Sequence, residues 1–512
     1  MASGSSHDEN LAGWSAVFAV AALCCLPVIL TPVAPLVDLY AHVSRFQILS
    51  GTAIGPSIAE NYQAHWALLP NIGFDVLGTG LMLVVPPLAA ARLIAVIMLL
   101  APFLGTVYLS FVLHGRIFPL TAVFAGIAAH SSILVWGFSN FLLGLGLSLV
   151  ALGLWIGQSH APRRQLVTAS ILAIVILLCH GFAFMLWGLC LGMIELALMR
   201  ERGALSPANL LRRAGRLLLI AVIPVLTFLN MPTAGAEGGA FASLANFADH
   251  IEAGQLWQRL WAEVVDRVDW FLRVSNSTYP VFDRILGAFL WLFLAAMLWR
   301  GWLRIDRRMT FAILLALLLV WITPPTFFSS GHLPKRLPLL LLVLIVAAPD
   351  FSGTRARSVA AIVLVAMLAL RIAVSSWGWA QDGASYRKFL AVLADTDTGS
   401  LGARYSAAGF QREASRPNCA PLESLMLLKN GTSVPTFANS FQQPLRIIGP
   451  LAAAKDAVAA LPDDIDAAAA LAAYRAAGFD AIVLCSDRPV DAPEGLRAVA
   501  SDGAWTLFTA VR

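Results

Sequence analysis

The run ARLIAVIMLLAPFLGTVYLSFVL, residues 91–113, carries a single charged side chain, Arg92, and is long enough to cross a bilayer as a helix. Similar apolar runs recur along the chain, and we predict about 11 membrane-spanning helices: 13–34, 91–113, 118–135, 139–157, 166–180, 182–199, 217–232, 281–299, 310–329, 337–349 and 358–376. Hydrophobic residues make up 59% of the 512 residues and charged residues 13%, whereas soluble domains usually carry about 25% charged residues. The sequence therefore predicts a polytopic α-helical membrane protein, in contact with lipid over much of its surface.

Two places in this pattern leave alternatives open. The spans on either side of Cys179 and His180 are short, and one long bent helix could replace them. The stretch 69–90 is apolar but is interrupted by Asn71, Asp75 and three prolines. We expect that stretch to lie in the membrane interface or to re-enter the membrane.

The distribution of arginines predicts the orientation. If the N-terminus is cytoplasmic, the loops on that side hold 14 basic and three acidic residues, whereas the loop 233–280 falls outside with six acids and three basic residues. This is the positive-inside bias of membrane proteins. With an odd number of spans the C-terminus lies outside, so we expect a multi-pass protein of a bacterial inner membrane with a periplasmic C-terminal domain.

The segment 377–512 has the composition of a small water-soluble domain, with 12 basic and 14 acidic residues. An Ala-rich stretch, 467–478, predicts a helix, and strands are predicted over 481–485, 495–500 and 505–511. We therefore divide the chain into a transmembrane domain, 1–376, and an extracytoplasmic α/β domain, 377–512. Cys419 and Cys485 could form a disulfide bond there, but their spacing does not decide it.

The loop 35–90 follows the first span and holds the first set of candidate site residues. Asp38, His42 and Arg45 are spaced so that a helix would place all three on one face. A carboxylate can act as a general base or bind a divalent cation, and an arginine can bind phosphate. The alternative is an interfacial helix held by an ion pair. Glu60 and His65 lie farther along the same loop and are further candidates for binding substrate.

A second set of candidates lies closer to the C-terminus. His332, Lys335 and Arg336 form a compact basic cluster in the short outside loop before the span 337–349. They would bind phosphate at the membrane surface, or else anchor the helix at the interface by snorkelling. His180, at the outside end of two spans, is either a site residue or a helix cap.

The outside loop 233–280 interleaves six acids, among them Asp249, Glu252 and Glu263, with Trp257, Trp261 and Trp270. Carboxylates beside aromatic rings can hold sugars, but tryptophans at this height are also typical of an interfacial belt. The Gly-rich stretch 137–146 favours close helix packing. No basic stripe indicates a nucleic-acid partner.

This layout resembles the GT-C fold of membrane glycosyltransferases, in which an acidic residue follows the first span and an extracytoplasmic domain is often present at the C-terminus. The matching features are Asp38 in VDLYAH, residues 37–42, the interfacial stretch 70–87 and the tail 377–512. The resemblance implies transfer of a sugar from a polyprenyl-phosphate donor to a glycan, lipid or protein acceptor outside the cytoplasm. Asp38 would be the general base, assisted by His42, and Arg45 with Lys335 or Arg336 would neutralise the departing phosphate.

Many relatives have two adjacent acids at this position, whereas Leu39 follows Asp38 here. Glu60 or Asp75 could supply a second carboxylate for Mg²⁺ or Mn²⁺, so the sequence leaves metal use open. Two other classes of function stay in view, a transporter or flippase and a non-catalytic scaffold for envelope assembly. Transport is disfavoured because the spans hold almost no charged residues and show no two-fold repeat.

Overall fold

The computed structural model describes residues 3–53, 55, 57–232, 256–277, 279–324, 331–351, 354–408, 410, 418–438, 442–462 and 464–511. The chain forms two compact units. Unit 1 comprises Met1–Leu26, Leu69–Gly73 and Val96–Ser375, and unit 2 comprises Pro27–Leu68, Phe74–Ala95 and Ser376–Arg512.

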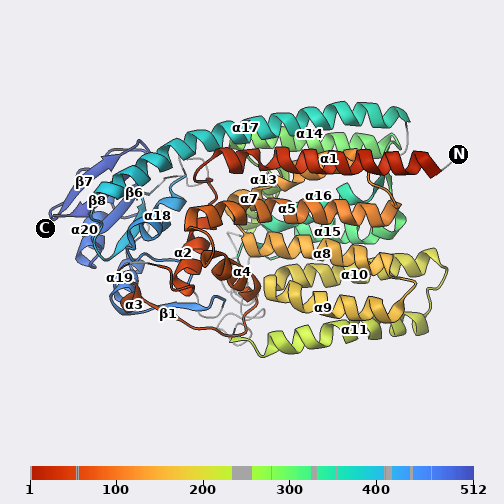
Figure 1. Ribbon diagram of the computed structural model, residues 1–512, viewed down its shortest axis with the longest axis horizontal. Helices are drawn as coiled ribbons and strands as arrows, with labels where there is room; N and C mark the ends of the chain where they lie inside the picture. Colours follow the sequence, from red (N-terminus) through yellow and green to blue (C-terminus); the bar gives the residue numbers. More distant parts are fainter. Residues whose placement is uncertain are drawn as a thin grey trace. The chain divides into compact units, whose positions relative to one another are not determined.

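Unit 1 is a bundle of long helices that lie side by side (Figure 1). Its helices, three of which continue into unit 2, are α1 (Ser3–Leu30), α5 (Pro87–His114), α6 (Pro119–Ala129), α7 (Ser132–Trp136), α8 (Ser139–Gly157), α9 (Pro162–Cys179), α10 (Gly181–Glu201), α11 (Pro207–Leu229), α13 (Leu256–Leu272), α14 (Pro280–Trp299), α15 (Thr310–Ile322), α16 (Leu333–Ala347) and α17 (Thr354–Asp395). In the described part of the chain, seven helices are long and apolar enough to cross a membrane. The polytopic α-helical class is thus confirmed. Each of the eleven predicted spans overlaps a helix, but their number stays a prediction.

Small residues set the packing inside this bundle, as the stretch 137–146 predicts. A Cβ atom on Gly146 of α8 would lie 2.5 Å from the carbonyl carbon of Ala101 in α5. One on Gly105 would lie 2.6 Å from the Gly146 carbonyl oxygen. Helices α5 and α8 can approach this closely only because glycine occupies both positions.

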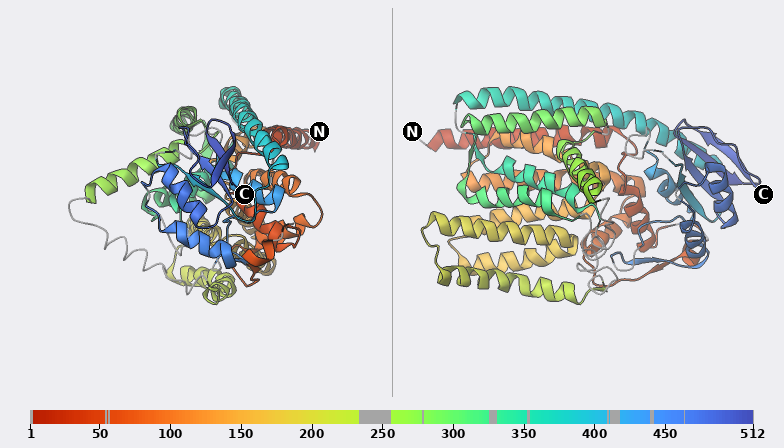
Figure 2. Two further views of the ribbon diagram at one scale, coloured as in Figure 1. Left: turned by 90° about the vertical axis from the view of Figure 1, so that its left-hand side faces the viewer. Right: turned by 180° about the vertical axis from the view of Figure 1, so that it is seen from behind.

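Short structures connect the helices at the arginine-rich end of the bundle. Strand β2 (Arg304–Ile305) pairs antiparallel with β3 (Pro349–Asp350), and the 3₁₀ helix η2 (Arg307–Met309) leads into α15. At the opposite end, α13 occupies part of the predicted loop 233–280 and lies obliquely to its neighbours in Figure 2. Asp249 and Glu252 of that loop fall outside the described residues.

Unit 2 combines the first outside loop with the C-terminal segment. Its elements are α2 (Leu39–Leu49), α3 (Ile58–Asn61), β1 (Tyr62–Ala64), α4 (Ile72–Met82), β4 (Gly402–Ser406), α18 (Ala420–Asn430), β5 (Leu445–Ile447), α19 (Gly449–Ala459), α20 (Ala467–Ala476), β6 (Ala481–Cys485), β7 (Leu496–Ser501) and β8 (Trp505–Ala510). Four strands form one sheet in the order β4-β6-β8-β7, with β4 parallel to β6 and the other pairs antiparallel. The predicted helix and three strands are confirmed to within about two residues at each end.

Several contacts join the first loop to the C-terminal segment within unit 2. Strand β1 pairs antiparallel with β5. The Tyr62 hydroxyl donates to the Val434 carbonyl over 2.6 Å and accepts from the Val434 amide over 2.8 Å. Cys419 and Cys485 form a disulfide bond, with their Cα atoms 6.2 Å apart. The bond ties the start of α18 to the end of β6.

Candidate functional site

Helix α2 arranges the first set of candidates as the spacing predicts. Asp38 is the N-cap residue, half-buried, and its carbonyl accepts a hydrogen bond of 3.1 Å from the His42 amide. One turn later, Arg45 Nη2 donates to His42 Nδ1 over 2.9 Å. The three residues therefore follow one side of the first two turns of the helix.

Arg45 is completely buried, and its charge is balanced by a residue that lies on a different helix. Its Nε atom donates to Asp75 Oδ1 over 2.7 Å, and both side chains have zero exposure. Its Nη1 atom donates to the Phe437 carbonyl over 3.4 Å. A buried guanidinium needs such a counterion, because an unpaired charge in the protein interior is costly. Burial raises the pKa of the Asp75 carboxyl, and the Arg45 charge opposes this effect.

The contact with Arg45 also determines the state of His42. A guanidinium can only donate hydrogen bonds, so His42 Nδ1 must accept and the ring proton must be on Nε2. Burial and the positive charge of Arg45 lower the pKa of His42 well below its usual value. The Phe437 ring packs edge-on against the imidazole at 4.9 Å between centroids. His42 is thus held as a neutral imidazole whose Nε2–H can donate.

The other candidates of this loop lie on different elements. Glu60 is exposed on α3. His65 is half-buried just after β1, and its backbone amide donates to the Pro444 carbonyl over 2.8 Å. Across the described residues, no three His, Cys, Asp or Glu side chains gather as metal ligands. Asp38 and Glu60 therefore remain predicted ligands only.

In unit 1, the start of α16 places the predicted basic cluster against a group of aromatic rings. Lys335 Nζ lies 4.2 Å from the centre of the Trp270 ring and 4.5 Å from that of Trp136. The Arg336 guanidinium lies 4.7 Å from the centre of Phe138. These are cation–π distances, so aromatic rings hold both side chains.

His332 precedes α16 in a left-handed conformation, with φ of 58°. Its ring lies 5.2 Å from Trp136 and 6.5 Å from Phe138, measured between centroids. Left-handed backbone is uncommon for residues other than glycine, and it persists where surrounding contacts hold it. The aromatic rings therefore hold all three members of the basic cluster.

His180 separates α9 from α10, so the alternative of one bent helix is wrong. Its Nδ1 atom accepts from the Phe182 amide over 3.2 Å and caps α10. The ring packs edge-on against Phe141 at 5.5 Å. The structure thus gives His180 the capping interaction that the sequence left as an alternative, and a role in binding substrate remains a prediction.

Comparisons with known proteins find a likeness in structure only. No protein-family model matches the chain, and no curated protein matches its sequence. Among solved structures, the chain is similar to ArnT from Cupriavidus metallidurans bound to undecaprenyl phosphate, with a TM-score of 0.48 and 13% identity over 98% of each chain. The apo form gives 0.47 and 14% over the same shares.

An oligosaccharyltransferase from Archaeoglobus fulgidus, in complex with zinc and sulfate, has a TM-score of 0.39 and 12% identity, over 92% of this chain and 68% of that one. Both proteins have the GT-C fold that the sequence resembles. At TM-scores of 0.39–0.48 the likeness assigns no substrate and no residue role to this chain.

Sequence reasoning missed a second buried ion pair, this one inside the bundle of unit 1. Arg371 of α17 pairs with Asp283 of α14, and both side chains have zero exposure. Asp283 Oδ1 also accepts from the amide and the hydroxyl of Ser277, over 2.9 and 2.8 Å. The available signal was an arginine alone in the apolar span 358–376, because such a charge needs a partner within the bundle.

Proposed function

We propose that this chain is an integral membrane glycosyltransferase that transfers a sugar from a polyprenyl-phosphate donor to an envelope acceptor on the outer face of the inner membrane. The observation that carries the proposal is the chain of contacts from Asp75 through Arg45 to His42, on the helix whose N-cap position is Asp38. A buried ion pair is expensive to build, and here it fixes the protonation of a histidine one turn from a carboxylate.

In the proposed reaction, Asp38 takes the proton of an acceptor hydroxyl. The hydroxyl oxygen bonds to the anomeric carbon of the sugar while the bond from that carbon to the phosphate oxygen breaks. The polyprenyl phosphate leaves as an anion, and Asp38 later releases its proton to water.

His42 and Arg45 have different proposed roles. The Nε2–H of His42 donates a hydrogen bond to the acceptor or the sugar, since the ring is held neutral and in one tautomer. Arg45 is a positioning residue, because its nitrogens already bond Asp75, His42 and the Phe437 carbonyl. We therefore do not propose the direct contact between Arg45 and the departing phosphate that the sequence suggested.

Lys335 and Arg336 are the proposed ligands of the donor phosphate. Their charges are desolvated on one side by aromatic rings, which strengthens the attraction to an anion. Metal use stays open in the proposal, with Asp38 and Glu60 as the carboxylates that would bind Mg²⁺ or Mn²⁺.

The Cys419–Cys485 disulfide supports the proposed compartment. Structural disulfides persist in the periplasm and rarely in the cytoplasm. The bond belongs to unit 2, which also contains Asp38, and the arginine bias of the loops independently favours the same orientation.

The alternative function, transport, would require charged residues inside the bundle to take part in moving a substrate across the membrane. Asp283 and Arg371, however, neutralise each other and are sealed from solvent. A transport path would need charged groups that line an accessible cavity. The pair therefore favours a structural role for these charges.

The test is a transfer assay with the full-length protein in nanodiscs, using undecaprenyl-phosphate-linked sugars and envelope material from cells that lack the protein. Wild-type protein should transfer label, and Asp38→Asn should lower turnover by at least about 100-fold, as expected for loss of a general base. Asp456→Asn, an exposed acid on α19, is the matched control. Full activity of folded Asp38→Asn would overturn the proposal.

A further inference from the structure

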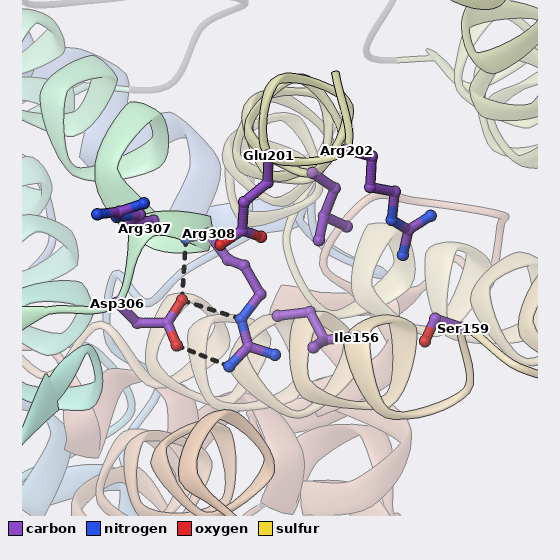
Figure 3. A pocket seen from close by; sticks show the side chains of 8 residues that line it. Ile156, Ser159, Glu201, Arg202, Asp306, Arg307 and Arg308 are labelled. Carbon is purple, nitrogen blue, oxygen red and sulfur yellow. Dashed lines mark hydrogen bonds and ion pairs between the residues drawn. The ribbon is translucent and has the colours of Figure 1, made fainter. Parts of the chain in front are cut away.

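A polar cavity of about 380 Å³ lies at the arginine-rich end of the unit 1 bundle, where α8, α10 and η2 meet (Figure 3). Eight residues line it: Ile156, Ser159, Leu198, Glu201, Arg202, Asp306, Arg307 and Arg308. The proposed transferase chemistry uses none of these residues. Helices α8, α10 and α16 all begin at the other end of the bundle, and the proposed phosphate ligands Lys335 and Arg336 lie at the start of α16.

The base of the cavity is held in place by Asp306 and Arg308. Arg308 donates to both carboxylate oxygens of Asp306, over 2.9 and 2.6 Å, and to the Leu113 carbonyl over 2.6 Å. The Asp306 amide in turn donates to the Ala348 carbonyl over 2.9 Å. Burial alone would raise the pKa of Asp306, but the hydrogen bonds from Arg308 lower it, so the pair stays ionised. The site is therefore built before any ligand binds.

The lining carries three guanidinium groups against two carboxylates, which leaves one net positive charge. Asp306 is paired with Arg308, and the Glu201 carboxylate also interacts electrostatically with the Arg308 guanidinium. In Figure 3, Arg202 extends toward Ser159, and the Glu201 carboxylate points toward the Arg308 side chain. An anion beside Arg202 and Arg308 would also have the Ser159 hydroxyl and the Glu201 carboxylate near it.

The remaining wall is apolar and belongs to the membrane spans. Ile156 lies in the last turn of α8 and Leu198 in the last turn of α10. A ligand with a phosphate headgroup could therefore place its charge on the arginines and its acyl chains along these helices. Basic pockets between spans on the cytoplasmic side are typical sites for anionic lipid headgroups.

We infer that this cavity binds the headgroup of an anionic phospholipid, with the phosphate on Arg202 and Arg308 and the headgroup hydroxyls on Glu201 and Ser159. The chemistry is that of phosphatidylglycerol. A free phosphate would leave the apolar wall uncovered, and a zwitterionic lipid would not use the net positive charge.

Native mass spectrometry of the purified full-length protein, titrated with phosphatidylglycerol in mixed micelles, tests the inference. Wild-type protein should retain phosphatidylglycerol in preference to phosphatidylcholine and phosphatidylethanolamine. Arg202→Gln should weaken this retention about fivefold, the effect of one interfacial cation. Arg164→Gln removes an exposed arginine near the start of α9, outside the cavity, and should leave retention unchanged.

Three results would overturn the inference. Equal losses in the two variants would mean diffuse attraction to a basic surface. Equal binding of phosphatidylethanolamine would indicate a zwitterionic ligand. Displacement of the lipid by millimolar inorganic phosphate would indicate a site for soluble phosphates. If Arg202→Gln does not fold, Arg202→Lys keeps the charge and should retain most of the binding, while Ser159→Ala should weaken it.

Discussion

At the scale of single residues, the buried Arg45–Asp75 pair gives the clearest prediction about the free energy of unfolding. Removing one partner leaves the other charge buried and unpaired, which typically costs about 3–5 kcal/mol. Asp75→Asn should therefore lower the free energy of unfolding by this amount, measured as a loss of thermal stability by tryptophan fluorescence in detergent. Asp456→Asn, exposed on α19, should have little effect. Similar stabilities for the two variants would show that the buried pair does not form.

His42 gives a prediction about pH. Its pKa is well below 6.5 in the folded protein, so below about pH 6.5 the unfolded chain binds a proton that the folded imidazole does not. The stability that His42 contributes is present above this pH and is lost as the pH falls, by up to about 1.4 kcal/mol per pH unit. The wild-type melting temperature should consequently fall more steeply than that of His42→Gln between about pH 6 and pH 5. Parallel curves would mean that His42 titrates normally.

The residue scale also shows where prediction from sequence ends. The spacing of Asp38, His42 and Arg45 is a local property of one helix, and the structure confirms that helix. Asp75 lies 30 residues later, in a stretch expected at the interface, and nothing local indicates that its carboxylate reaches Arg45. The roles of Arg45 and His42 depend on this distant contact, so the sequence could suggest the residues but not their states.

At the scale of elements, too, the sequence predicts local features but not contacts between distant segments. Strands β6, β7 and β8 are bounded by turns and have clear apolar patterns, so the sequence predicts them closely. The parallel pairing of β4 with β6 and the pairing of β1 with β5 join segments far apart in the chain. Register between distant strands depends on tertiary packing rather than on local pattern, and those elements were missed.

The disulfide between α18 and β6 supplies a prediction at this scale. It closes a segment with a sequence separation of 66 residues, and a native disulfide of this kind contributes about 2–4 kcal/mol. Cys419→Ala should therefore lower the melting temperature, and reduction of the wild-type protein should do the same. Addition of reductant to Cys419→Ala should cause no further loss. Thiol counting in denaturant should find four free cysteines before reduction and six after it.

At the scale of the whole molecule, three features bear on how the chain lies in the membrane. Arginines concentrate at one end of the unit 1 bundle, where the cavity beside Arg202 and Arg308 lies. Helix α17 has 42 residues, about 63 Å, roughly twice what the hydrocarbon core requires. Its last part, from Ser376, belongs to unit 2, which also contains the disulfide. These features agree if the arginine-rich end is cytoplasmic and unit 2 is periplasmic.

This orientation can be tested with alkaline phosphatase, which folds and becomes active only after export because it needs its own disulfides. Phosphatase fused to the C-terminus should be active, and phosphatase inserted between α10 and α11, after Gly203, should be inactive. A fluorescent protein that folds only in the cytoplasm should give the opposite result at both positions. Activity at the α10–α11 connection would reverse the orientation. It would place the Asp38 helix on the cytoplasmic side, where a reducing compartment would also oppose the Cys419–Cys485 bond.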